Sequence, residues 1–101
     1  MIDLSEIEVV NNREESRFEA ALGDLIAFSE YNQAGSNIVF NHTEVPVEFE
    51  GQGVGRKLAE TALNYARENN LKVIPLCPFI AAFIRRNPQY QPLVWGYKAQ
   101  K

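Results

Sequence analysis

The glycine-rich stretch Glu50–Gly55 separates two parts of the chain that have different hydrophobic periods. Before it, apolar and polar residues alternate in four short segments, the pattern typical of half-buried strands. After it, Val54, Leu58, Ala62 and Ala66 recur at the spacing of one face of an amphipathic helix. A chain whose period changes once in this way is expected to form a sheet first and then to pack helices against it.

Turn-forming residues mark where each predicted element ends. The four early strands lie close together along the chain, as in an antiparallel meander. A short apolar strand follows the first helix, and a second helix comes next, with Pro78 suited to its first turn. We therefore predict an α+β fold with a mostly antiparallel, twisted sheet and two main helices packed on it. The predicted strands are 7–12, 16–22, 23–33, 37–45 and 71–76, and the predicted helices are 54–70 and 78–86.

Length and composition restrict the class of protein. The 101 residues fit one small domain that spans residues 1–101, and the apolar content of 46% can supply a core. Because the net charge is -3, no nucleic-acid partner is expected. The chain has one cysteine, Cys77, so an intramolecular disulfide is impossible and a reducing compartment is favoured. With no apolar run of membrane-spanning length and no signal peptide, we expect a cytoplasmic protein without a membrane partner.

The glycine-rich stretch has the features of an anion site. The first N–H groups of a helix lack intrahelical partners, and the helix dipole makes that end positive. Main-chain N–H groups of residues 52–57 are therefore suited to hold a phosphate or pyrophosphate, with Arg56 and Lys57 adding positive charge. A Walker A loop is excluded because Gly55 is followed by Arg56-Lys57-Leu58, which has no hydroxyl residue, and the glycine spacing differs from a dinucleotide fingerprint. A glycine-rich turn without a ligand is the open alternative.

The same residues resemble the GNAT N-acetyltransferase superfamily. Its motif A reads Arg/Gln-x-x-Gly-x-Gly/Ala where the fourth strand meets the next helix, and Glu50–Gly55 is the equivalent stretch here. The resemblance is strongest over residues 40–83. The segments FNHTEVPVEFEGQGVGRKLAETAL and VIPLCPF are similar to the short YjdJ-like branch of that superfamily.

The resemblance implies a GNAT-like α/β arrangement whose sheet splays between the fourth and fifth strands. Acetyl-CoA would bind there, with its pyrophosphate on the main chain of residues 52–57 and its pantetheine arm in the gap beside residues 44–47. Phe79 and Phe83 are expected in the core, with the alternative that one of them lines the pantetheine channel. The residues assigned to cofactor binding are Val45, Val47, Gln52, Gly53, Val54, Gly55, Arg56, Lys57, Pro78, Phe79 and Phe83.

The chain departs from the family pattern at three positions. Glu50 stands where Arg or Gln is usual, and the proline that often precedes the motif is shifted to Pro46. Many members carry a Tyr on the helix after the fifth strand as general acid. The equivalent position here is Ile84 or a neighbour, and Tyr90 is an alternative source of that group.

Cys77 and His42 are the candidate catalytic residues. Cys77 comes just before a helix start, where thiol pKa values fall, so it is suited to accept the acetyl group covalently and pass it on. His42 is a candidate base for the incoming amine or for Cys77, on a strand face that it shares with Phe40 and Glu44 if alternation holds. A small buried cysteine and a structural histidine are the alternatives. No metal site is expected, because no ligand spacing is visible.

These features predict an acetyl-CoA-dependent N-acetyltransferase that acts on an amine, with Cys77 as a candidate carrier. An exposed protein amine is the favoured acceptor, because a domain this small has few insertions to enclose a metabolite. Arg85 and Arg86 either contact the 3′-phosphate of CoA or form a solvated helix end. The alternatives are a non-catalytic CoA or acyl-CoA-binding module and a binder of another phosphate or nucleotide. The sequence does not indicate an oligomeric state.

Overall fold

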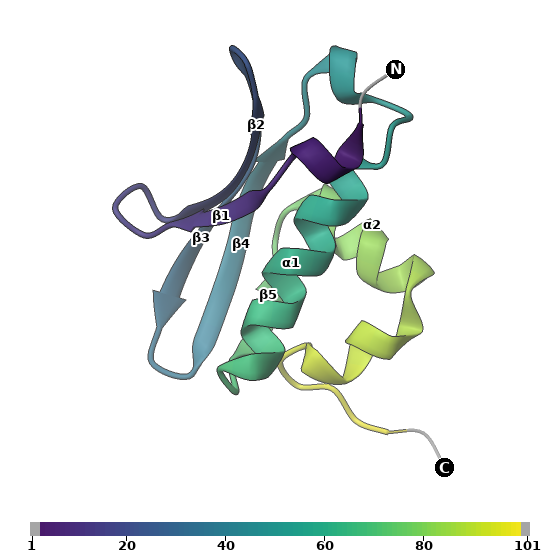
Figure 1. Cartoon of the computed structure of the whole chain (residues 1–101). Coiled ribbons are helices and arrows are strands. Elements are labelled where there is room, and N and C mark those ends of the chain that lie inside the picture. Colours follow the sequence, from purple (N-terminus) through teal and green to yellow (C-terminus); the bar gives the residue numbers. More distant parts are fainter. Residues whose placement is uncertain (1–2, 100–101) are drawn as a thin grey trace.

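A computed structural model describes residues 3–99 as five strands, two α-helices and three short 3-10 helices (Figure 1). The ends of the predicted domain, residues 1–2 and 100–101, lie outside the described residues. The elements are η1 Leu4–Glu6, β1 Val9–Asn12, β2 Arg17–Leu22, β3 Leu25–Ala34, β4 Asn37–Glu44, η2 Val47–Phe49, α1 Val54–Glu68, β5 Lys72–Pro75, α2 Pro78–Arg86 and η3 Pro88–Leu93. Both helices begin at the predicted residues.

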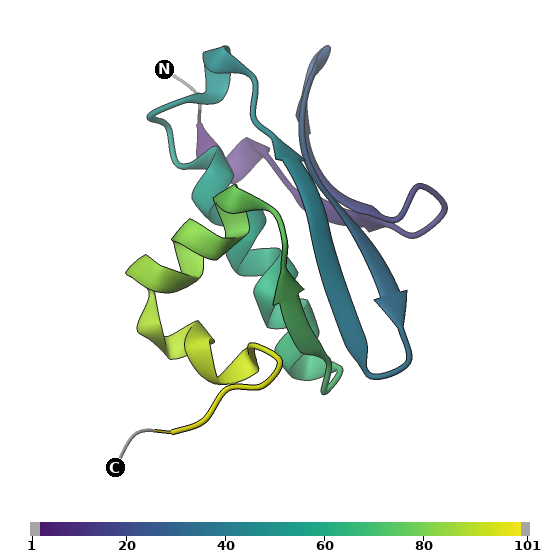
Figure 2. The same ribbon diagram turned by 180° about the vertical axis from the view of Figure 1, so that it is seen from behind.

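The strands form one sheet in the order β1-β2-β3-β4-β5. The first four strands are an antiparallel meander, whereas β5 runs parallel to β4. Helix α1 makes the crossover that a parallel pair requires. The mostly antiparallel α+β sheet with two main helices is therefore confirmed, and Figure 2 shows β5 at the edge of the sheet next to α1 and α2.

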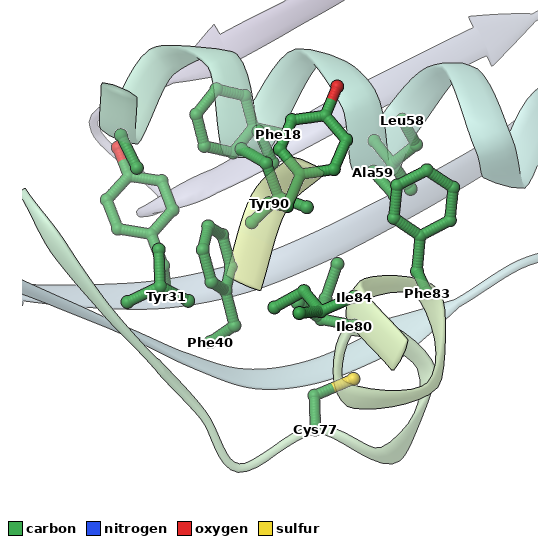
Figure 3. Close-up of a cluster of buried hydrophobic side chains, with 14 of the residues drawn as sticks. Phe18, Tyr31, Phe40, Leu58, Ala59, Cys77, Ile80, Phe83, Ile84 and Tyr90 are labelled. Atoms are coloured by element: carbon green, nitrogen blue, oxygen red, sulfur yellow. The ribbon is translucent and has the colours of Figure 1, made fainter. Parts of the chain in front are cut away.

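Helix α1 packs its apolar stripe on the sheet and forms the core with it. Leu58, Ala62 and Ala66 are fully buried on the helix, and Phe18 and Phe40 are fully buried on the strands. The rings of Phe18 and Phe40 lie 6.5 Å apart between centroids, so the strands that carry them share one packed layer (Figure 3). Burial of this apolar surface fixes α1, and with it the glycine-rich stretch, against the end of β4.

Strands β4 and β5 pair only over part of their length. Their register runs from Asn37 opposite Lys72 to Phe40 opposite Pro75. The N–H of Cys77 then donates to the carbonyl of Phe40 at 2.9 Å, and residues 42–44 pair with β3 alone. The predicted splay between the fourth and fifth strands is confirmed. It leaves one edge of β4 free of a strand partner in this segment.

A β-bulge changes the faces of β4. Tyr31 pairs with Phe40 and Glu30 pairs with His42, so Asn41 is an extra residue on β4. The extra residue reverses the alternation from that point onward. Phe40 is buried in the core, whereas His42 is exposed on the opposite face. The prediction that Phe40 and His42 share a face is therefore wrong.

The end of the fourth predicted strand also differs from the structure. Strand β4 ends at Glu44, one residue before the predicted end, and Val47 lies in η2, so the strand conformation that the resemblance implies for residues 44–47 is wrong beyond Glu44. Pro46 stands just before η2 and fixes a backbone conformation that suits the entry to a turn. At the other end of the chain, η3 leads to a bridge between Val94 and Val73, which covers the outer edge of β5.

Candidate functional site

A groove of about 580 Å³ lies where the end of β4, the start of α1 and one face of α2 meet. Its size falls in the range of small-molecule sites. Four of the lining residues have large apolar side chains, and the charged lining residues are two arginines and one glutamate. The lining residues are Thr43, Val45, Phe49, Glu50, Gly51, Gly53, Gly55, Arg56, Phe79, Phe83, Arg86 and Asn87.

The first turn of α1 supplies the polar side of the groove. Gly53 is the N-cap residue, with φ 83° in the left-handed region that favours glycine, and no side chain caps the helix. The N–H of Lys57 makes the first intrahelical bond, to the carbonyl of Gly53 at 3.0 Å. The N–H groups of residues 53–56 therefore precede the helix ladder at its positive end. This geometry suits an anionic ligand.

Gly55 has a different role from the other glycines. It has an ordinary helical φ, but a Cβ here would lie 2.9 Å from Cζ of Phe79 and 3.6 Å from Cγ2 of Val45. The missing side chain lets Phe79 on α2 and Val45 after β4 approach the first turn of α1. The side chains of Phe79 and Val45 therefore form an apolar wall directly beside the N–H groups of this turn.

Two cations and one carboxylate line the groove. Arg56 lies on α1 and forms an i,i+4 ion pair with Glu60 at 3.4 Å, and its guanidinium lies 6.0 Å from the centroid of the Phe83 ring. Arg86 is one turn beyond Phe83 on α2, while Glu50 precedes the glycines. The lining therefore carries a net positive charge, which favours an anionic ligand.

Lys57 points away from the groove. Its Nζ donates to the carbonyl of Leu4 at 3.0 Å and to the carbonyl of Ile7. These bonds fasten η1 to the start of α1. Lys57 therefore holds the fold together here, and its side chain is absent from the groove lining.

The groove lining divides the predicted cofactor residues into two groups. Val45, Gly53, Gly55, Arg56, Phe79 and Phe83 line it, whereas Val47, Gln52, Val54, Lys57 and Pro78 do not. Val47 is 73% exposed on η2, and the side chain of Val54 is fully buried in the core. Pro78 forms the first turn of α2. The main-chain N–H of Gln52 donates to the carbonyl of Phe49, and its side-chain Nε2 donates to the carbonyl of Glu48. Gln52 therefore stabilises the loop.

Cys77 is the N-cap residue of α2 and is 2% exposed. It belongs to the buried apolar cluster shown in Figure 3. Its thiol donates to Oγ1 of Thr43 at 3.1 Å, and Thr43 Oγ1 lies 2.9 Å from Oγ of Ser29. Because Thr43 lines the groove and Cys77 does not, the sulfur lies one hydrogen bond behind the groove wall.

His42 and Cys77 are not brought together. Nε2 of His42 lies 2.8 Å from Oε2 of Glu44 on the exposed face of β4, and its ring is 6.1 Å from that of Phe28. Cys77 bonds to Thr43 on the opposite face of the strand. His42 is therefore not placed to deprotonate Cys77, but it has the carboxylate partner that orients a histidine base.

The tyrosine alternatives also lie away from the groove. Ile84, at the position where the family resemblance implies a Tyr, is buried. The hydroxyl of Tyr90 lies 3.4 Å from Oδ1 of Asn64, and its ring packs 5.9 Å from that of Phe83. Tyr90 is absent from the groove lining. Neither position therefore places a tyrosine hydroxyl in the groove lining.

Three lining residues were not predicted from the sequence as part of the site. Thr43 faces the groove only because the bulge turns it there. Phe49 is fully buried in η2, a short helix that the sequence pattern did not predict. Asn87 ends α2 and donates from Nδ2 to the carbonyl of Phe83 at 2.8 Å. Asparagine after a basic helix end is a C-terminal signal that could have indicated this bend.

Within residues 3–99, no group of three or more His, Cys, Asp or Glu side chains is arranged to hold a metal ion. In the same range, no helix combines the length and the apolar character needed to cross a membrane.

Comparison with known proteins gives consistent matches. A family model described as GCN5-related N-acetyl-transferase matches residues 17–93. The chain is 33% identical to Protein NATD1 of Gallus gallus over 90 residues, 86% of this chain and 82% of that protein. It is 38% identical to Protein NATD1 of Homo sapiens over 64 residues, 62% of this chain and 57% of that protein. The solution structure of a GCN5-like protein from Staphylococcus aureus has a TM-score of 0.73 and 32% identity, covering 95% of each chain. The YjdJ-like branch is not tested by these matches and stays a prediction.

Proposed function

Because the chain belongs to the GCN5-related N-acetyltransferase family, we propose that it transfers the acetyl group of acetyl-CoA to an amine. The observation that carries the proposal is the groove at the start of α1, where an anion-binding turn stands beside an apolar wall. Acetyl-CoA has the matching order of groups, with a pyrophosphate followed by a long pantetheine arm. When bound, it supplies an activated acetyl thioester.

The phosphate groups fit the polar end of the groove. The N–H groups of residues 53–56 would donate to the pyrophosphate, and Arg56 would add charge beside them. Arg86 lies further out along α2, at the end of the stripe that begins with Phe79. We assign it to the 3′-phosphate of CoA, whereas Arg85 is outside the lining. Glu50 is the one carboxylate in the lining, and the two arginines outweigh it.

The pantetheine arm fits the apolar side. Val45, Phe79 and Phe83 form that wall. The edge of β4 beyond Phe40 has no partner from β5, so its main chain is available for the amides of the arm. The arm would then run toward Thr43, at the strand segment where the two strands part. This placement puts the thioester beside Thr43.

His42 is proposed to take the proton of the attacking amine. It lies next to Thr43 in sequence but on the opposite face of β4, where Glu44 orients its ring. An amine that approaches from that face would meet His42 before it reaches the thioester. An exposed amine, such as a lysine of another protein, is the proposed acceptor class, and the proposed setting is the cytoplasm.

Cys77 is a second candidate for a direct part in the transfer. Its thiol is buried behind Thr43, so it can carry the acetyl group only if its sulfur becomes accessible from the groove. Intact mass after incubation with acetyl-CoA tests this step. An added acetyl group in the wild type that is absent in Cys77→Ala supports the relay, whereas full turnover by Cys77→Ala contradicts it.

A CoA-binding module without turnover is the alternative, and the lack of a tyrosine in the groove lining favours it. The deciding experiment incubates the protein with acetyl-CoA and a lysine-containing peptide, and follows thiol release together with the peptide mass. Enzyme-dependent acetylation of the peptide supports the proposed function. Binding of acetyl-CoA without acetylation of any amine in a panel of peptides and small amines supports the alternative.

A further inference from the structure

Three hydrogen-bonding side chains meet behind the inner end of the groove. Ser29 and Thr43 are direct cross-strand partners, and their hydroxyl oxygens lie 2.9 Å apart. Cys77 donates its thiol proton to the same Thr43 oxygen at 3.1 Å. Ser29 is fully buried and Cys77 nearly so, whereas Thr43 is half-buried and lines the groove. Thr43 is therefore the one member of this trio that a ligand can touch.

The direction of these bonds follows from the donors that must be satisfied. The Ser29 hydroxyl has no exposure, and within residues 3–99 Thr43 Oγ1 is its one hydrogen-bond partner. A buried hydroxyl proton is directed at a partner, so Ser29 donates to Thr43. Cys77 donates to Thr43 as well. A threonine hydroxyl has two acceptor positions and one proton, so both acceptor positions are filled from behind and the proton is left for the groove.

From this arrangement we infer that the Thr43 hydroxyl donates a hydrogen bond to the carbonyl oxygen of the bound acetyl thioester. The inference rests on the proposed function. Attack on a thioester develops negative charge on its carbonyl oxygen, and a donor fixed in advance at that place stabilises the charge. Ser29 and Cys77 hold Thr43 in a single orientation, so no reorientation is needed during the reaction. Thr43 thereby supplies a donor at a site whose lining has no tyrosine.

The vibration of the bound carbonyl reads out this hydrogen bond without turnover. The probe is acetyl-CoA labelled with carbon-13 at the carbonyl, and the measurement is isotope-edited infrared spectroscopy of the complex. A hydrogen bond lowers the stretching frequency of the carbonyl, so the frequency is expected to rise in Thr43→Val and to stay near the wild-type value in Thr43→Ser. Thr61→Val is the matched control, because Thr61 bonds to the carbonyl of Lys57 on α1 and is outside the lining.

Ser29→Ala tests the assigned direction. If Ser29 donates to Thr43, its removal leaves the proton of Thr43 in the groove and the carbonyl frequency unchanged. A lower frequency in Ser29→Ala would mean that Thr43 donates to Ser29 in the wild type, and would overturn the inference. If Thr43→Val does not fold because Ser29 is left unpaired, the double variant Ser29→Ala/Thr43→Val replaces it. That variant removes the buried Ser29 hydroxyl and leaves only the thiol of Cys77, a weak donor, without its partner.

Kinetics provide the second readout. Loss of one such donor is expected to lower kcat about 100-fold in Thr43→Val, with the dissociation constant for acetyl-CoA within about 3-fold of wild type. Equal carbonyl frequencies and equal kcat in wild type and Thr43→Val would overturn the inference while leaving acetyl-CoA binding intact. A wild type that binds no acetyl-CoA would overturn the proposed function and the inference with it.

Discussion

At the scale of single residues, two neighbouring cations on the first turn of α1 have different environments. Arg56 lines the groove and remains largely exposed, with one ion pair to Glu60. Lys57 faces the other way and donates to two main-chain carbonyls of the N-terminal segment. Sequence alone assigns both to the ligand, because a helix start makes adjacent positive charges look equivalent. The structure separates them by about 100° around the helix.

This difference predicts opposite effects of matched substitutions. Lys57→Met is expected to lower the free energy of unfolding by about 1.5–3 kcal/mol, because hydrogen bonds to a charged donor are lost. The same variant should keep the dissociation constant for acetyl-CoA within about 3-fold of the wild-type value. Arg56→Met is expected to change stability by less than about 0.5 kcal/mol and to weaken acetyl-CoA binding about 10-fold. Urea denaturation measures the stability, and calorimetric titration measures the affinity for acetyl-CoA. Equal changes of stability and affinity in the two variants would contradict the assignment of Lys57 to the fold and Arg56 to the ligand.

His42 allows a prediction at the same scale. Because it is exposed and bonded only to Glu44 among the described residues, His42→Ala is expected to leave the melting temperature nearly unchanged. Because His42 is the proposed base, His42→Ala is expected to lower kcat about 100-fold and to retain the affinity for acetyl-CoA. Glu44→Gln, which keeps the size of the side chain but not its charge, is expected to give a smaller loss of the same kind. Unchanged kcat in both variants would remove His42 from the mechanism.

At the scale of elements, the site depends on how β4 ends and how α1 begins. The bulge at Asn41 turns Thr43 toward the groove and His42 to the other face. The glycine at position 55 lets α2 approach the first turn of α1, with Phe79 as the contact. The groove is thus formed by irregularities in two regular elements, and the sheet and α1 hold those irregularities in place.

Gly55→Ala tests the second of these irregularities. Alanine within a helix is more favourable than glycine by about 0.5–1 kcal/mol, so the variant is expected to be at least as stable as wild type. Its Cβ would displace the ring of Phe79 into the groove, so acetyl-CoA binding is expected to weaken about 10-fold or more. Thermal denaturation and calorimetric titration separate the two effects. The double variant Gly55→Ala/Phe79→Leu should recover part of the affinity, and no recovery would contradict the proposed steric cause.

The same elements show what could be predicted from the sequence. The order of strands and helices follows from the change of period, and Gly53 and Pro78 mark the helix starts that the structure has. The face of Thr43 was not predictable, because a one-residue bulge leaves no mark in composition. The partners of Lys57 were not predictable either, because they are main-chain carbonyls about fifty positions away in sequence. Local patterns gave the elements, whereas the contacts between them required the structure.

At the scale of the whole molecule, one apolar layer connects the sheet to both helices and supports the groove from behind. Tyr31 is part of this layer, packed 5.3 Å from Phe18 and 6.4 Å from Phe40 between ring centroids. Its hydroxyl donates to Oδ1 of Asn11 at 2.7 Å. Burial raises the pKa of Tyr31 above its ordinary value, by more than the hydrogen bond to Asn11 lowers it.

The raised pKa of Tyr31 makes stability depend on pH on the alkaline side. Above the ordinary tyrosine pKa of ~10, the unfolded chain releases this proton while the folded protein keeps it, so the free energy of unfolding falls as pH rises. Tyr31→Phe is expected to be less stable than wild type at neutral pH, because the bond to Asn11 is lost, and the difference should shrink in alkaline solution. Urea denaturation at neutral pH and in alkaline solution measures this difference in stability, and Tyr97→Phe, at an exposed tyrosine, is the control. A difference that stays constant with pH would contradict the assigned effect of burial.

The central claim is that the groove at the start of α1 binds acetyl-CoA through its phosphates and its pantetheine arm. Calorimetric titration of the purified protein with acetyl-CoA, and with ATP as the control for phosphate groups alone, tests it most directly. We predict a micromolar dissociation constant for acetyl-CoA and at least about 10-fold weaker binding of ATP, with Arg56→Met weakening the binding of both ligands because both carry phosphate groups. Equal affinity for the two ligands would make the groove a general phosphate site. No binding of acetyl-CoA would contradict the account.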